Sequence, residues 1–158
     1  MTGGHAGDDE GAGAEPATAV AIHRGPEPFP HTVRIREHEL LADEPPEYGG
    51  RDTGPDPTEL LAAALASCTS MTVRSYAERK GWGLDGMTVE VGFVEVGGDG
   101  RPSYTVTLDL PDDLDDAQAE RLAAIALKCP VRRALTAGAA MQDDVRHGSH
   151  PVTAEQAR

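Results

Sequence analysis

The feature that most limits how this chain can fold is a long uncharged run near its middle. No charged residue occurs from Leu60 to Val73, and the run is shorter than the roughly 20 apolar residues of a membrane span. A helix start signal precedes it, with Asp56 at the N-cap and Glu59 three positions later as an Asp version of the capping box. The pattern predicts a helix over residues 57–80, ended by Gly81 and buried on every side along its uncharged half.

Strand signals lie on both sides of this helix. Residues 17–23 and 31–41 have β-like patterns, the second with apolar and basic side chains in alternation, and a Gly/Pro turn separates them. Beyond the helix, apolar side chains alternate again over residues 87–96 and 103–110. The glycine-rich segment 97–100 joins these two runs, which predicts a β-hairpin.

A second helix is predicted near the C-terminal end. It begins at Asp115 or Asp116, where Gln118 can complete a capping box, and four residues share its apolar stripe: Leu122, Ile125, Ala126 and Cys129. Pro130 breaks this helix, so Cys129 lies at a kink or at the N-cap of a short helix through residue 135. After that helix, residues 138–152 are expected to hold at most one short strand.

Length and charge define the class of protein. The 158 residues suit one domain, which we expect over residues 17–158, after a disordered Gly/Ala-rich acidic tail at 1–16 and with a flexible end at about 146–158. The net charge of −13 argues against nucleic acid and anionic membranes as partners, because both would be repelled. Two cysteines without a secretory signal favour a cytoplasmic protein.

The two cysteines occupy different environments. Cys68 lies in the middle of the uncharged helix, where desolvation raises the pKa of a thiol. Cys129 lies at a helix start among the cations Lys128, Arg132 and Arg133, which favour a thiolate, and it is expected to be the more accessible of the two. The alternative is that both are ordinary buried thiols, which is the common fate of cysteine in a core.

Two motifs connect these cysteines to a known family. The stretch DPTELLAAALASCTSM, from Asp56 to Met71, resembles the cysteine-bearing central helix of the OsmC/Ohr family, and KCPV, at residues 128–131, resembles its second cysteine motif. The resemblance extends from about residue 19 to residue 137 and favours the OsmC-like branch. It implies an α+β fold in which antiparallel sheets wrap long central helices, made as an intertwined homodimer with its site at the subunit interface. A helix that is apolar on every side agrees with this, since a second subunit could cover it.

The resemblance also implies an activity. Family members are thiol-dependent peroxidases, so Cys68 is expected to reduce an organic hydroperoxide, and also hydrogen peroxide, in oxidative stress defence. Cys129 would resolve the oxidised sulfur, and an external thiol or dihydrolipoyl group would reopen the disulfide, with no bound cofactor. An apolar pocket around Cys68 would favour organic peroxides, because burying apolar area gains roughly 25 cal/mol per Å².

The family's activating arginine and glutamate have weaker counterparts here. Arg24 follows the first strand at about the matching place, and three other arginines are its rivals: Arg34, Arg36 and Arg51. The family glutamate falls at Thr58, so Glu59, one place later, is the candidate. Glu59 and Cys68 are nine positions apart, which places them on opposite faces of a helix.

Other readings remain open at this stage. Arg132 stands where family members often carry histidine, and a cation there would lower the pKa of Cys129 further. The same fold could be a non-catalytic binding module with an apolar pocket at the dimer interface, or a cysteine redox sensor. No histidine has metal-ligand spacing to a cysteine or carboxylate, so we expect no metal site.

Overall fold

The computed structural model describes residues 18–95, 102–147 and 150–152, and it combines helices with antiparallel sheets as the α+β prediction requires. The chain divides into two compact units, one ending at Pro57 and the other beginning at Thr58. The expected tail at 1–16 lies outside the described residues. The expectation of one domain over 17–158 stays a prediction.

The N-terminal unit is a three-stranded antiparallel sheet in the order β1-β2-β3. Its strands are β1 (Ala19–His23), β2 (His31–Ile35) and β3 (His38–Ala42). The prediction of one continuous strand-like stretch over 31–41 is wrong, because the chain reverses at Arg36, where φ is 55°. Tight hairpins usually show Gly or Asn at such a position, so an arginine gives no turn signal.

A buried carboxylate fixes the loop that follows β3. Asp43 is only 2% exposed, and it accepts hydrogen bonds from the backbone N–H groups of Glu44, Arg51 and Thr53 and from the Thr53 hydroxyl. Burial raises the pKa of Asp43, but these hydrogen bonds outweigh it and leave the pKa below its ordinary value. The Pro/Gly-rich loop, with a 3₁₀ turn at Pro46–Tyr48, is therefore tied to one side chain.

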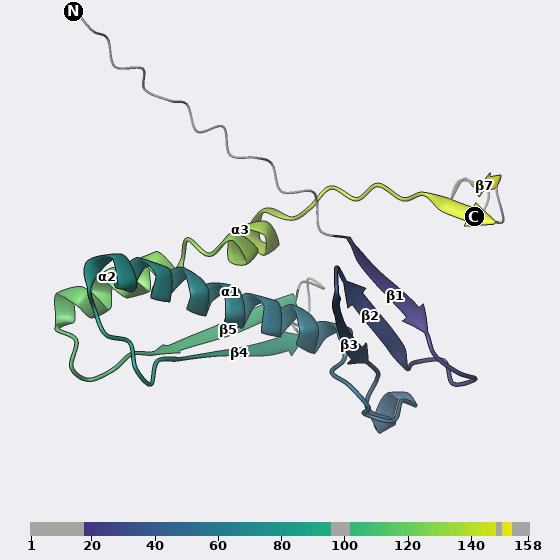
Figure 1. Ribbon diagram of the computed structural model, residues 1–158, viewed down its shortest axis with the longest axis horizontal. Coiled ribbons are helices and arrows are strands. Elements are labelled where there is room, and N and C mark those ends of the chain that lie inside the picture. The colour runs from purple at the N-terminus through teal and green to yellow at the C-terminus, as the bar shows by residue number, and fades with distance from the viewer. Residues whose placement is uncertain (1–17, 96–101, 148–149, 153–158) are drawn as a thin grey trace, which may run out of the picture. The chain divides into compact units, whose positions relative to one another are not determined.

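The C-terminal unit is built on α1 (Pro57–Lys80) and the hairpin of β4 (Thr88–Glu95) and β5 (Pro102–Asp109). Both elements confirm the sequence predictions, and the left-handed Gly81, at φ 69°, follows the last helical residue. Figure 1 shows α1 lying lengthwise along the hairpin. None of the described helices is long and apolar enough to span a bilayer.

Two shorter helices follow the hairpin. The predicted start of α2 (Asp116–Ala126) is confirmed: Asp115 accepts from the Gln118 N–H at 2.7 Å, and the Gln118 side chain accepts from the Asp115 N–H at 3.0 Å. After α3 (Pro130–Ala137), two short strands, β6 (Val145–His147) and β7 (His150–Val152), pair where at most one was expected.

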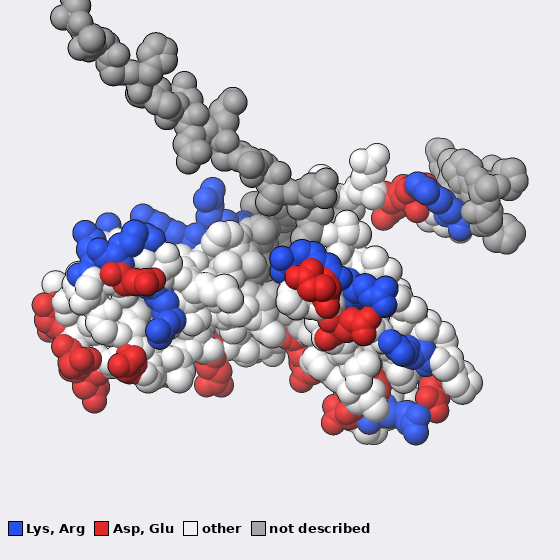
Figure 2. Space-filling view, in the orientation of Figure 1, with Lys and Arg blue, Asp and Glu red and all other residues white. Residues whose placement is uncertain are grey.

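The core of the C-terminal unit joins the second half of α1 to α2. Its buried members are Val73, Ala77, Leu84, Leu122 and Ala126. Trp82 packs against this cluster and meets Tyr76 edge to face, with ring centroids 5.9 Å apart. Basic side chains surround Tyr76, and Figure 2 shows them gathered where α1 ends.

The uncharged half of α1 is not buried on every side in the single chain, so the expectation of cover on all sides, in part from a second subunit, stays a prediction. The buried residues of α1 form one stripe spaced by four: Leu65, Thr69, Val73 and Ala77. Leu61 is 39% exposed and Met71 is 69% exposed, although neither is flanked by charge. One hairpin and one helix cover only one face of a neighbouring helix.

Candidate active site

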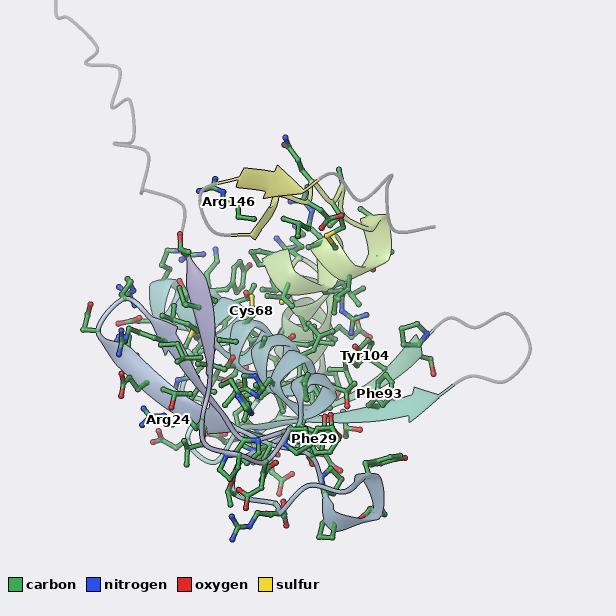
Figure 3. The ribbon with its side chains drawn as sticks, turned by 90° about the vertical axis from the view of Figure 1, so that its right-hand side faces the viewer. Arg24, Phe29, Cys68, Phe93, Tyr104 and Arg146 are labelled. Atoms are coloured by element: carbon green, nitrogen blue, oxygen red, sulfur yellow. The ribbon has the colours of Figure 1, made fainter. Side chains whose placement is uncertain are left out.

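The two cysteines belong to adjacent parts of the C-terminal unit and are both reduced. Cys68 lies on α1, where Figure 3 labels it, and is partly buried. Cys129 is the N-cap of α3 and is fully buried, at 0% exposure. Each thiol shifts the pKa of the other through a side-chain hydrogen bond, so the fold brings together two sulfurs that are distant in sequence. The expectation that Cys129 is the more accessible thiol is wrong.

The backbone between α2 and α3 explains why Cys129 is buried. The Cys129 N–H donates to the Ala126 carbonyl at 3.3 Å, which closes the end of α2. Pro130 cannot donate to a continued helix and takes the first position of α3 instead. The Arg133 N–H then donates to the Cys129 carbonyl at 3.0 Å. α2 ends at Ala126, before Cys129, so Cys129 lies at the N-cap of α3, which is one of the two predicted positions, and its thiol faces the first turn of α3.

Amide groups at the start of α3 favour a thiolate at Cys129. Burial raises the pKa of Cys129, but hydrogen bonds from the Arg132 and Val131 backbone N–H groups, the Cys68 thiol and the Thr69 hydroxyl outweigh it, so the pKa is lowered. The prediction that the pKa of Cys129 is lowered is confirmed. Arg132 contributes through its backbone N–H, which is a different route from the guanidinium charge expected from sequence.

The pKa of Cys68 shifts in the opposite direction, as predicted. Burial raises the pKa of Cys68, and so does its neighbour Cys129, while the Val131 N–H and the Thr72 hydroxyl lower it only in part. In the reduced pair the lowered pKa of Cys129 and the raised pKa of Cys68 favour the thiolate at Cys129. A nucleophilic Cys68 would need a further cation to take the charge.

Thr69 lies one turn before Val73 on the buried stripe of α1, and its side chain is unusual. It is 0% exposed, and its Oγ1 has no hydrogen-bond partner of normal geometry in the described part of the chain. Its influence on the Cys129 pKa shows that the hydroxyl faces that sulfur. A thiol is a weak acceptor and a thiolate a strong one, so the hydroxyl gains a strong acceptor when Cys129 ionises.

The other two candidate residues are Arg24 and Glu59. Arg24 belongs to the N-terminal unit, where its Nε donates to Thr32 Oγ1. Glu59 lies in the first turn of α1, nine positions before Cys68 on the same helix and hence on its opposite face. The roles of Arg24 and Glu59 stay predictions.

The rival arginines are solvent-exposed members of the N-terminal sheet and loop. Arg34 pairs with Glu39 at 2.7 Å, and Arg51 pairs with Glu27 at 2.9 Å. Arg36 forms the β2–β3 turn. The two ion pairs give Arg34 and Arg51 structural partners of their own.

A cavity of about 540 Å³ lies between α1, β5 and α3, and its lining includes Leu65, three positions before Cys68, and Arg132, three positions after Cys129. Its apolar wall comes mainly from Leu61, Leu65, Val106 and Leu135, and its polar groups include Tyr104 and Arg132. An apolar pocket near Cys68 was expected from the sequence, and of these residues the sequence singled out Arg132 alone, for its charge near Cys129. The available signal was the spacing of Arg132, Leu135 and Thr136, which places them on one side of α3.

Among the residues that the structure describes, no three side chains of the metal-binding types His, Cys, Asp and Glu converge.

Comparison with known proteins identifies a family that the chain matches. A family model described as "OsmC-like protein" matches residues 50–142, which include both cysteines. No curated protein sequence matches the chain.

Several solved structures share the fold. An organic hydroperoxide resistance protein OsmC of Legionella pneumophila is 26% identical, with a TM-score of 0.54 over 75% of this chain and 88% of that chain. The organic hydroperoxide resistance protein OhrB of Bacillus subtilis is 25% identical, with a TM-score of 0.52 over 75% and 88%. An OsmC-like protein of unknown function from Vibrio cholerae is 16% identical, with a TM-score of 0.62 over 77% and 94%.

Proposed function

Since the chain belongs to the OsmC-like protein family, we propose that it is a cysteine-based peroxidase that reduces organic hydroperoxides in oxidative stress defence. The observation that carries the proposal is the thiol pair, in which Cys68 and Cys129 are close enough to share a proton. The names of the Legionella and Bacillus relatives support the same substrate class.

The chemistry divides between the two sulfurs. The Cys68 thiolate attacks one peroxide oxygen, the O–O bond breaks, and the alkoxide takes a proton and leaves as an alcohol. Cys68 is left as a sulfenic acid. The Cys129 sulfur attacks that group, water leaves, and a disulfide forms. An external thiol or dihydrolipoyl group then supplies two electrons and two protons to reopen it.

Access is the reason for assigning the attack to Cys68. It is partly exposed whereas Cys129 is fully buried, so only Cys68 can meet a substrate without local opening. Its raised pKa opposes this role, and a nearby guanidinium would correct it. We propose Arg24 for that function, and Glu59 as the carboxylate that orients the arginine or the peroxide.

A second copy of the chain completes the proposed enzyme. Leu61 and Met71 leave apolar surface exposed on α1 in the single chain. An intertwined homodimer would cover it, and its partner could also supply the cation that Cys68 lacks.

Mass spectrometry after one equivalent of cumene hydroperoxide tests the proposal. We expect rapid loss of two hydrogens from the wild type, a trapped sulfenic acid in Cys129→Ser and no reaction in Cys68→Ser. Sulfenic acid in Cys68→Ser but not in Cys129→Ser would exchange the two roles. Slow and equal oxidation of both thiols would contradict peroxidase function and favour a binding module.

A further inference from the structure

We propose that Thr69 is a positioning residue for the resolving step, in which its hydroxyl holds the Cys129 sulfur in the form that attacks oxidised Cys68. The inference rests on the proposed peroxidase function and assigns one of its steps to the residue that follows Cys68 in the chain. Thr69 itself does not react. Its proton stays on the oxygen, and the residue acts through the sulfur that it faces.

The packing of α1 against α2 places Thr69 opposite Cys129. Val73 and Ala126 belong to the same buried cluster, and α2 runs back along α1 in the opposite direction (Figure 1). Thr69 lies one turn before Val73 on the buried stripe, and Cys129 follows Ala126 by three residues. One turn back along α1 and a few residues beyond α2 therefore lead to the same place, where both residues are 0% exposed.

The Thr69 hydroxyl has no other acceptor of normal geometry among the residues that the structure describes. Hydroxyl side chains within helices commonly donate to the carbonyl one turn back, as Thr72 does to Cys68 at 2.7 Å and Ser67 does to Ala63 at 2.8 Å. Thr69 does not follow this pattern, although buried polar groups nearly always have partners. Its donor is therefore available to a sulfur acceptor.

The chemistry of the resolving step explains why a donor matters here. The Cys129 thiolate gives an electron pair to the Cys68 sulfur, the S–S bond forms, and the S–O bond of the sulfenic acid breaks. The departing hydroxide takes a proton from solvent and becomes water, so the Cys129 sulfur is oxidised and the Cys68 sulfur is reduced. The thiolate is the nucleophile, and a hydroxyl that donates to it increases the ionised fraction at a given pH.

Other groups around Cys129 also affect its ionisation. The titratable and charged neighbours are the Cys68 thiol on α1 and three cations around the start of α3: Lys128, Arg132 and Arg133. The last turn of α2 carries no charged side chain. Because variants at Thr69 leave all of these groups in place, a comparison among them isolates the hydroxyl.

Trapping of the sulfenic acid measures the resolving step. With cumene hydroperoxide as oxidant and a fixed excess of dimedone, Cys68 divides between a dimedone adduct and the disulfide, and intact mass spectrometry gives their ratio. At about pH 6, Thr69→Val should lose about tenfold in thiolate and recover about threefold through the greater nucleophilicity of a less stabilised thiolate. We therefore expect its disulfide-to-adduct ratio to be about threefold below wild type. At about pH 10, where Cys129 is ionised in both proteins, the ratio should equal or exceed that of wild type.

Two control variants and a second readout accompany this experiment. Thr69→Ser keeps the hydroxyl and should restore the wild-type ratio at both pH values. Ser67→Ala removes a hydroxyl from the other neighbour of Cys68, one that already donates to the Ala63 carbonyl, and should leave the ratio unchanged. Without peroxide, the ¹³Cβ chemical shift of Cys129 in the reduced protein should titrate at higher pH in Thr69→Val than in wild type or Thr69→Ser.

The outcomes separate this proposal from the peroxidase function. Absence of a dimedone adduct in Cys129→Ser would overturn the peroxidase, and the resolving step with it. An adduct in Cys129→Ser, together with an unchanged ratio at about pH 6 or an unchanged titration in Thr69→Val, would overturn the role of Thr69 alone. Equal losses at both pH values, or a Thr69→Ser variant that behaves like Thr69→Val, would indicate a displaced Cys129 and also overturn it.

Discussion

Replacing Thr69 with valine should stabilise the reduced protein at low pH and lose that advantage at high pH. The Thr69 hydroxyl is fully buried and lacks a normal hydrogen bond, and such a group costs about 1–3 kcal/mol. Valine has nearly the same shape without the hydroxyl. With Cys129 protonated, we expect Thr69→Val to raise the free energy of unfolding by about 1–2 kcal/mol, or roughly 4 °C in Tm per kcal/mol.

The effect of Thr69→Val on the free energy of unfolding should change sign once Cys129 ionises. Because the folded-state pKa of Cys129 is lowered, the stability gained from its thiolate is present above the unfolded pKa and is lost as pH falls through the folded value. In the thiolate state the Thr69 hydroxyl donates to a charged acceptor, an interaction worth about 1.5–3 kcal/mol. The valine variant gives up this bond, so its advantage should shrink or reverse.

Urea unfolding followed by circular dichroism, in a reducing buffer at about pH 5 and about pH 10, measures both effects on either side of an ordinary thiol pKa. Thr72→Val is the matched control, because its hydroxyl donates to the Cys68 carbonyl at 2.7 Å and its loss should destabilise at both pH values. A loss of stability in Thr69→Val at low pH would mean that the hydroxyl has a good partner, and would refute the reasoning.

Three further predictions follow from the same structure. The pKa of Cys129 in the reduced protein, followed through the ¹³Cβ chemical shift of labelled cysteine because the buried thiol is out of a reagent's reach, should lie below the ordinary thiol pKa of about 8.5, and titration at or above that value would contradict the lowered pKa. Asp43→Asn should lower the protection of backbone amides from hydrogen exchange in the 43–53 loop. In the wild type that protection should be full above the ordinary aspartate pKa of about 3.9, and it should fall as the pH drops through the lower folded-state pKa of Asp43. Unchanged protection in Asp43→Asn would show that the carboxylate does not hold the loop. Leu122→Ala should cost about 2–5 kcal/mol by urea unfolding, because its side chain is fully buried, while Leu127→Ala, 61% exposed, should cost much less; similar losses would mean that the core lies elsewhere.

Local rules were enough to predict most of the fold. Gly81 ends α1, and the Asp115 and Gln118 pair begins α2, because caps and left-handed glycines act within a few residues. The turn at Arg36 escaped prediction, since its positive φ is imposed by the pairing of β2 with β3 and not by residue type. What covers the rest of α1 could not be predicted for a related reason: an uncharged sequence indicates that a surface can be covered and does not identify what covers it.

The two cysteines of the site could be predicted from the sequence, whereas the residues around them could not. Pro130 alone placed Cys129 at a helix start, and helix-start amides then lower the pKa of its thiol. Its full burial depends on where α2 ends against α1, which is a tertiary property. The pocket needs three elements at once, so Arg132 and Tyr104 had no common signal in the sequence.

The unequal exposure of the two sulfurs would determine which sulfur of a disulfide between them a reductant attacks. A bulky reductant could reach only the Cys68 side, so the mixed disulfide would form there and Cys129 would depart. Thiols of low pKa leave faster, and the amides of α3 lower the pKa of the one that must depart. The α3 amides would thus act in regeneration, by making Cys129 the better leaving group each time the enzyme is reset.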